Sequence, residues 1–228
     1  MTAEEDPFRA RQALYGVLQA VFRYPLTRAK LEPLRHLESG VPGIERSLAA
    51  LREFCAGIDA WDRLVEELNV EYTRLLEGPG RAPAPPYASF YLNDGRLKGT
   101  AWLAARRRYA EQGLVVEDAD GTPEDHITLE LAFMSHLSAV MAEAVSRQDR
   151  EQAAALIAAA QAFLRDHMLP WLPGFCSNVR AGARQPFFIM LADLLDGVLA
   201  NDMDWLGVEA GTICQANRDV RAGDKIPH

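Results

Sequence analysis

The stretch PEDHITLELAFMSHL, residues 123–137, begins a long apolar segment that contains one acid among its hydrophobic residues. Apolar residues recur there every three or four positions, which predicts a helix over residues 124–147 rather than a strand. Its apolar face carries Ile127, Leu131, Phe133, Met134, Leu137, Val140, Met141 and Val145. This helix is expected to lie in the centre of the fold.

Proline and glycine divide the rest of the chain into pieces of helical length with the same apolar spacing. The expected helices cover a stripe from Leu14 to Phe22 and residues 27–37, 44–56, 60–77, 97–113, 149–168, 173–181 and 186–203. No segment alternates with a period of two. The sequence therefore predicts an all-α, single-domain helical bundle of about eight to ten helices over residues 1–210. A proline-rich loop at 78–88 lies within it, and a flexible tail follows at 211–228.

Composition excludes several classes of protein. The chain has 24 basic and 32 acidic residues and a net charge of −8, which argues against binding to nucleic-acid phosphates. Its three cysteines form no C-x-x-C pair, which favours a reducing compartment. The N-terminus has no signal-peptide pattern, and the apolar run at 153–160 is too short to cross a bilayer. We expect a cytoplasmic protein that does not insert into the membrane.

Asp125, His126 and Glu130 suggest a site at the start of the helix at 124–147. Glu130 lies in the middle of the apolar face, where a carboxylate needs a partner, and His126 is the nearest candidate. One interpretation is structural: Thr122 and Asp125 cap the helix and His126 pairs with Glu130. Another is a binding site in which Asp125 and His126 are exposed to a cationic or hydrogen-bonding ligand.

A third interpretation is a hydrolase that depends on a metal held by His126 and Glu130. It is weak because His136 lies on a different face and no other ligand cluster has suitable spacing, so no metal site is predicted. A nucleotide hydrolase using the loop at 78–83 is also weak, because GPGRAP lacks the Lys-Ser/Thr of a phosphate-binding loop. The three arginines at 106–108 are best explained as a solvated helix face.

Four blocks resemble one family in their order and spacing. They are RQALYGVLQAVFRYP at 11–25, EYTRLLEGPGRAPAPPYASFYL at 71–92, PEDHITLELAFMSHL at 123–137 and FLRDHMLPWLPGF at 163–175. Together they span about residues 8–205. The chain resembles the TorD/DmsD family and the related NarJ-type proteins, which are redox-enzyme maturation chaperones, also called twin-arginine proofreading chaperones.

The resemblance implies an all-α cytoplasmic chaperone that is not an enzyme and carries no cofactor. Its partner would be the twin-arginine leader and immature catalytic subunit of a molybdopterin oxidoreductase of the DMSO-reductase superfamily, held until the molybdenum cofactor is inserted. The alternative within the family is a NarJ-like assembly factor for a membrane-bound nitrate reductase. A monomer and a homodimer both remain open. Some relatives have been linked with GTP binding, but no residue here locates such a site.

The resemblance also implies a set of binding residues. The signal-peptide site would comprise Tyr72, Leu75, Leu76, Pro86, Tyr87, Asp125 and His126, supported by Ser89 and Glu130. Leu76 stands where an aromatic residue is common in the family, and Tyr87 stands where tryptophan is frequent. On this view Asp125 meets the charge of the peptide and its loss costs only a helix cap, about 1 kcal/mol. Loss of Glu130 should weaken folding.

Overall fold

The structure is a computed structural model that describes residues 6–78, 82–116 and 121–223, with side chains described as far as residue 212. Its α-helices are α1 Pro7–Val21, α2 Arg28–Leu31, α3 Glu45–Ala56, α4 Trp61–Tyr72, α5 Ala88–Leu92, α6 Thr100–Glu111, α7 Ile127–Ser146, α8 Arg150–Phe163, α9 Leu172–Gly182 and α10 Pro186–Gly223. Short turns add η1 Glu32–His36, η2 Thr73–Glu77 and η3 Leu164–Met168. No strand occurs in these ranges, which confirms the all-α prediction.

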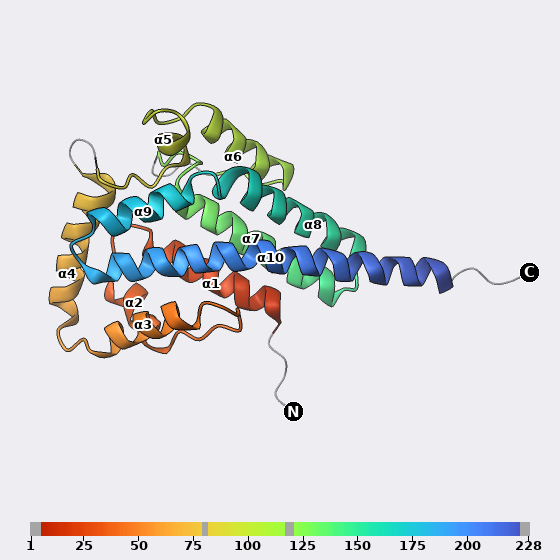
Figure 1. Ribbon diagram of the computed structural model, residues 1–228, viewed down its shortest axis with the longest axis horizontal. Coiled ribbons are helices and arrows are strands. Elements are labelled where there is room, and N and C mark those ends of the chain that lie inside the picture. The colour runs from red at the N-terminus through yellow and green to blue at the C-terminus, as the bar shows by residue number, and fades with distance from the viewer. Residues whose placement is uncertain (1–5, 79–81, 117–120, 224–228) are drawn as a thin grey trace, which may run out of the picture.

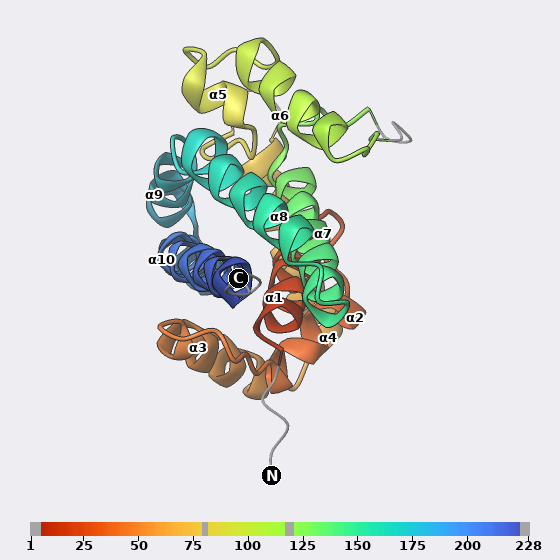
Figure 2. The same cartoon turned by 90° about the vertical axis from the view of Figure 1, so that its right-hand side faces the viewer.

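The two longest helices, α7 and α10, organise the bundle. The N-terminal α1 lies along α7, while α10 packs against α3, α8 and α9 (Figure 1). Figure 2 shows α10 nearly end-on, with α1, α3, α8 and α9 arranged around it. Leu14 and Leu18 of α1 and Leu131 of α7 are almost completely buried, as the apolar spacing predicts. None of the described helices combines the length and apolar character needed to cross a membrane.

A buried polar cluster joins the first helix to the last. Asp202 of α10 accepts hydrogen bonds from Arg11 Nε and from the Tyr15 hydroxyl, both at 2.8 Å. The Arg11 guanidinium also lies 3.4 Å from the centre of the Trp205 ring. Burial raises the pKa of Tyr15, and the Asp202 charge raises it further, so the hydroxyl keeps the proton that it donates. These contacts tie α1 to α10 through buried side chains.

The helix ends differ from the predictions in two ways. The segments expected as uninterrupted helices at 60–77 and 149–168 both end in π-helical turns, η2 and η3. The end expected near residue 203 is wrong, because α10 continues to Gly223 and reaches beyond the other helices (Figure 1). Trp205 packs on Phe8 and Leu206 is buried, so tertiary contacts carry the helix past that point. The division into a domain at 1–210 and a tail at 211–228 remains a prediction.

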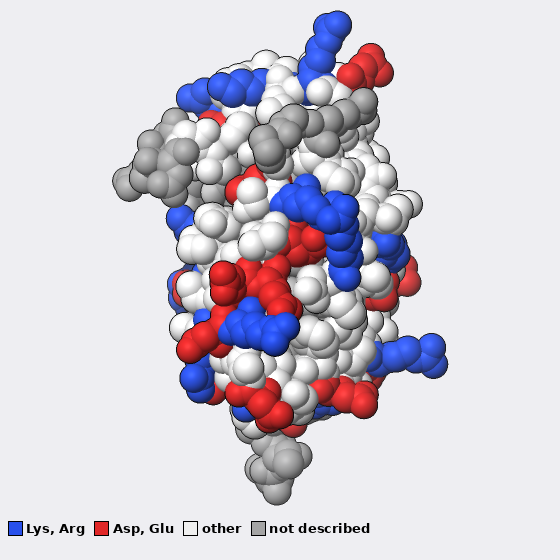
Figure 3. Space-filling model, turned by 90° about the vertical axis from the view of Figure 1, so that its left-hand side faces the viewer, with Lys and Arg blue, Asp and Glu red and all other residues white. Residues whose placement is uncertain are grey.

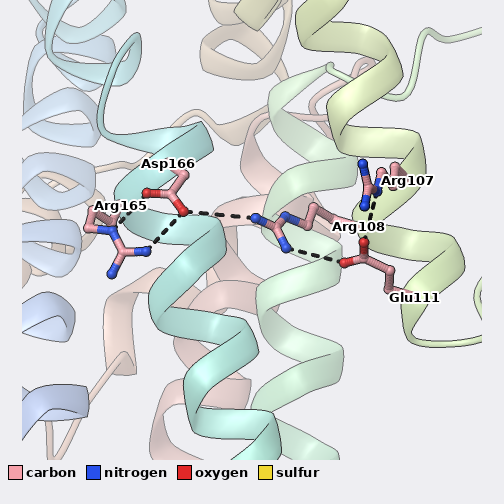
Figure 4. Close-up of polar contacts among 5 residues, drawn as sticks. All are labelled: Arg107, Arg108, Glu111, Arg165 and Asp166. Carbon is pink, nitrogen blue, oxygen red and sulfur yellow. Dashed lines mark hydrogen bonds and ion pairs between the residues drawn. The ribbon is translucent and has the colours of Figure 1, made fainter.

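An exposed ladder of ion pairs holds α6 against η3 (Figure 4). Arg107 and Arg108 of α6 both pair with Glu111 one turn later, at 3.0 and 3.2 Å. Arg108 also lies 3.8 Å from Asp166, which Arg165 contacts at 2.7 Å. Because these side chains are exposed, water and salt weaken each pair and its contribution to stability is small. The arginines thus have neighbouring carboxylates, as expected for a solvated helix face.

Candidate functional site

The described part of the proline-rich loop is fastened to the start of α7 by backbone hydrogen bonds. Ile127 N donates to the Pro86 carbonyl at 2.9 Å, and Ala88 N donates to the Asp125 carbonyl at 3.0 Å. Tyr87 and His126 therefore form an isolated antiparallel bridge. Two blocks that are far apart in the sequence thus meet, and the predicted residues on both sides of the bridge lie together.

Asp125 is buried inside this junction. Its side chain has no exposed surface, and Oδ2 accepts a hydrogen bond of 2.8 Å from the backbone N–H of Ser89 at the start of α5. Oδ1 has no hydrogen-bond partner among the described residues. The predictions that Asp125 caps the long helix and is exposed to a ligand are wrong. Because α7 begins only at Ile127, Asp125 precedes the cap and turns inward to α5.

The burial of Asp125 changes the expected effect of its removal. Asp125→Ala would leave the Ser89 N–H without an acceptor in a place closed to water, so we expect the free energy of unfolding to fall by about 1–3 kcal/mol. Asp125→Asn keeps a carbonyl oxygen for Ser89 and should lose less. Urea denaturation of both variants checks this. A loss from Asp125→Ala that is no larger than that from Asp125→Asn would contradict the assigned role.

His126 is the N-cap of α7. Its Nδ1 accepts a hydrogen bond from Thr128 N at 3.2 Å and lies 2.7 Å from the Thr128 hydroxyl oxygen. Burial lowers the pKa of His126 to about 4, so the ring is neutral near pH 7 and carries its proton on Nε2. Its ring contacts that of Tyr87 edge-on, with the centroids 4.9 Å apart. His126 therefore offers a neutral N–H donor rather than a charge.

The predicted pair of His126 and Glu130 is wrong. Glu130 has no exposed surface, and its Oε1 lies 2.8 Å from Nε2 of His167 while Oε2 accepts a hydrogen bond of 3.1 Å from Nε1 of Trp171. Burial raises the pKa of Glu130 despite the opposing effect of His167. Burial alone would lower the pKa of His167, but the Glu130 charge and hydrogen bond raise it overall. Glu130 thus ties α7 to η3 and the start of α9.

The Tyr72 and Leu75 part of the predicted site lies in the core. Tyr72, Leu75 and Leu76 are each at most 1% exposed. The Tyr72 hydroxyl donates a hydrogen bond of 2.6 Å to the carbonyl of Phe22 at the end of α1. The π-helical turn η2 places these residues inward and leaves Glu77 exposed beside them. Tyr72, Leu75 and Leu76 therefore support the site from the core, whereas the predicted Tyr87 is partly exposed at the surface.

A pocket of about 700 Å³ lies between the end of α1, the end of η2 and the start of α7. Its described lining consists of Gln19, Arg23, Tyr24, Tyr72, Glu77, Tyr87, Tyr109, Leu114, Val115, Val116, Thr122, His126, Thr128, Leu129, Ala132, Phe133 and His136. We call it the aromatic pocket. Tyr72, Tyr87 and His126 were predicted from the sequence, whereas Leu75, Pro86 and Asp125 do not line it.

A second pocket of about 700 Å³ adjoins the first and shares Glu77 and Tyr87 with it. Its other lining residues are Leu76, Ala82, Pro85, Phe90, Asp94, Gly95 and Leu97, and we call it the loop pocket. Sequence reasoning missed Glu77, although it ends the YTRLLE run directly before the first glycine of the loop. Tyr109 was also missed. Its hydroxyl donates to the Glu124 carbonyl at 2.9 Å, which brings α6 to the site.

Metal chemistry finds no support at the predicted residues. His126 and Glu130 have different hydrogen-bond partners, and the residues that the structure describes contain no group of three or more His, Cys, Asp or Glu side chains placed to hold a metal ion. The loop proposed for nucleotide hydrolysis, 78–83, lies partly outside the described residues.

The architecture defines an all-α protein whose aromatic and apolar pocket lies between a proline-rich loop and the ends of three helical elements, a form suited to binding a ligand. A family model described as the nitrate reductase delta subunit matches residues 39–177, more than half of the chain. The chain therefore belongs to the nitrate reductase delta subunit family, which confirms the resemblance seen in the sequence.

Similar proteins agree with this assignment. The chain is 36% identical over 179 residues to the chaperone protein TorD of Vibrio cholerae serotype O1, El Tor Inaba, covering 74% of this chain and 79% of that protein. It is 24% identical over 208 residues to TorD of Aliivibrio fischeri, covering 87% and 95%. A solved structure of a proposed redox enzyme maturation protein from Archaeoglobus fulgidus superposes with a TM-score of 0.50 at 25% identity, covering 82% and 93%. The predicted chaperone, as opposed to an enzyme, is confirmed.

Proposed function

We propose that this chaperone binds the twin-arginine leader and the immature catalytic subunit of a molybdopterin oxidoreductase of the DMSO-reductase superfamily. It holds this client until the molybdenum cofactor has been inserted. The observation that carries the proposal is the aromatic pocket formed where the proline-rich loop meets α7, in a chain that is similar to TorD chaperones. Because a leader is intact only before export, we place the binding in the cytoplasm.

The aromatic pocket suits the apolar part of a leader. Such a segment is helical and needs an apolar groove, together with a few polar groups that fix its position. Leu129 and Phe133 lie on successive turns of α7 in the pocket wall, and Tyr87 is half-buried at its edge. The Nε2 of His126 has no hydrogen-bond partner among the described residues, so it is available to a carbonyl of the peptide.

Tyr87→Ala should weaken leader binding about tenfold, because tyrosine is enriched among the interface residues whose truncation costs more than 1 kcal/mol. Fluorescence anisotropy with a labelled synthetic leader measures this. Val70→Ala, on the exposed surface of α4 outside both pockets, is the matched apolar truncation and should bind like the wild type. If no leader binds the wild type at micromolar concentrations, the proposed function is wrong.

A second client type is favoured by one specific observation. The matching family model is described by the delta subunit of nitrate reductase, which supports an assembly factor for a membrane-bound nitrate reductase whose catalytic subunit faces the cytoplasm. The similarity to TorD chaperones over three quarters of the chain supports an exported client instead. Affinity capture from the native host, followed by mass spectrometry of the bound subunit, distinguishes the two.

A further inference from the structure

The two pockets meet at one acidic residue. Glu77 and Tyr87 line both the aromatic pocket and the loop pocket, so these two side chains form the boundary between them. Glu77 follows directly after the buried Leu76 and is itself exposed. A peptide that fills both pockets must therefore pass the Glu77 carboxylate.

The charge of Glu77 is not neutralised by the described part of the protein. Its side chain forms no hydrogen bond or ion pair with any described residue, whereas Glu71, six residues earlier in α4, is held by Arg74 at 2.7 Å. Partial burial raises the pKa of Glu77, which is the effect expected for a carboxylate without a cationic partner. The same negative charge contributes to raising the pKa of both Tyr72 and Tyr87, so it acts at the boundary and inside the aromatic pocket.

The wider surface is compatible with a cationic ligand. The chain has a net charge of −8, and Figure 3, which views the molecule from the α4 side, shows acidic side chains gathered near the middle of this face. Arginine and lysine side chains lie beside and between them (Figure 3). A guanidinium that approaches Glu77 can form strong charge-assisted hydrogen bonds with its unpaired carboxylate. Asp125 cannot take this part, because it is buried against α5.

The pockets also differ in charge. The described lining of the loop pocket includes two carboxylates, Glu77 and Asp94, among apolar side chains. The aromatic pocket shares Glu77 but also contains Arg23, and most of its remaining lining is aromatic or aliphatic. Cationic residues are therefore favoured on the loop-pocket side of the boundary. An apolar segment is favoured on the aromatic side.

We propose that Glu77 is the residue that selects a cationic peptide: it receives a guanidinium of the bound leader, Asp94 receives the neighbouring one, and the apolar run of the leader continues into the aromatic pocket. This inference rests on the proposed function and adds the specificity residue and the direction of the peptide. The N-terminal, arginine-bearing end lies against residues 90–97. The apolar end lies against the first turns of α7.

Charge selection is tested with two labelled peptides, one with two adjacent arginines before an apolar run and one with glutamines in their place. Glu77→Gln should weaken binding of the arginine peptide about tenfold and leave the glutamine peptide unchanged, since only the charged hydrogen bonds are lost. Asp94→Asn should have a smaller effect, and asparagine tolerates the positive φ of 52° at this position. Glu66→Gln, an exposed acid on α4 outside both pockets, is the matched control and should bind like the wild type.

The outcomes separate this inference from the proposed function. If the arginine peptide binds the wild type and Glu77→Gln equally well, while Tyr87→Ala weakens it, the function stands and the role of Glu77 is overturned. If neither peptide binds the wild type, both fail. The direction is tested by photo-crosslinking from either end of the peptide. Labelling of residues 90–97 by the apolar end, or of residues 129–133 by the arginine end, would overturn it.

Discussion

Asp202→Ala is expected to lower the free energy of unfolding by about 3–5 kcal/mol, because it leaves the Arg11 guanidinium charged and unpaired in the core. Arg11 and Asp202 side chains are each only 2% exposed, so water cannot replace the lost carboxylate. The Tyr15 hydroxyl loses its acceptor at the same time. Chemical denaturation followed by circular dichroism measures the change.

The matched control removes both charges. In the double variant Arg11→Met and Asp202→Leu, no buried charge is left alone, and a buried ion pair replaced by apolar residues is often nearly neutral for stability. We therefore expect this variant to be more stable than Asp202→Ala alone, with a remaining loss from the Tyr15 hydroxyl. Equal losses in the single and double variants would show that packing, rather than the unpaired charge, governs this site.

Glu130→Ala is expected to lower the free energy of unfolding by a similar amount, about 3–5 kcal/mol. It removes the acceptor of both His167 and Trp171 and leaves a small cavity between α7 and η3. The partner left unsatisfied is therefore His167, not His126. Thermal and urea denaturation of the variant measure the loss, and leader binding is expected to weaken because the start of α7 forms the pocket wall.

Glu130→Gln separates shape from charge. It keeps the size of the side chain and one oxygen acceptor, so it should cost less than Glu130→Ala. His126→Ala removes a helix cap and a buried ring that packs on Tyr87, but it leaves no carboxylate partner unsatisfied, so it should cost less than Glu130→Ala. A loss from His126→Ala as large as that from Glu130→Ala would restore the pairing of these two residues and contradict the assignment to His167.

The spacing of apolar residues was sufficient to predict most of the helices, although it missed the short α5. Apolar residues at intervals of three and four have one stable solution, a helix with that face buried, so α1, α3, α4, α6, α7, α8 and α9 occur where expected. Helix ends were predicted less well because they depend on distant contacts. Trp205 and Leu206 continue α10 because Phe8 and the core contact them, which no local pattern of residues 203–223 could indicate.

The sequence grouped residues that the fold does bring together, but it assigned the wrong contacts to them. Pro86, Tyr87, Asp125 and His126 do lie together, because backbone hydrogen bonds join the loop to the start of α7. Their roles were predicted from the spacing of residues along one helix, which considers only partners one turn away. Glu130 instead pairs with His167, 37 positions away.

The sequence by itself determined the all-α class, the family and the two blocks that meet at the site, since periodicity and motif order are local properties of the chain. Only the tertiary structure decided which acid is buried inside the protein and which lies at the surface. Asp125 lies inside because α5 presents an unsatisfied N–H to it, and Glu77 lies outside because η2 turns Leu75 and Leu76 inward. A carboxylate's role depends on which donors surround it, and the fold supplies those donors from distant segments.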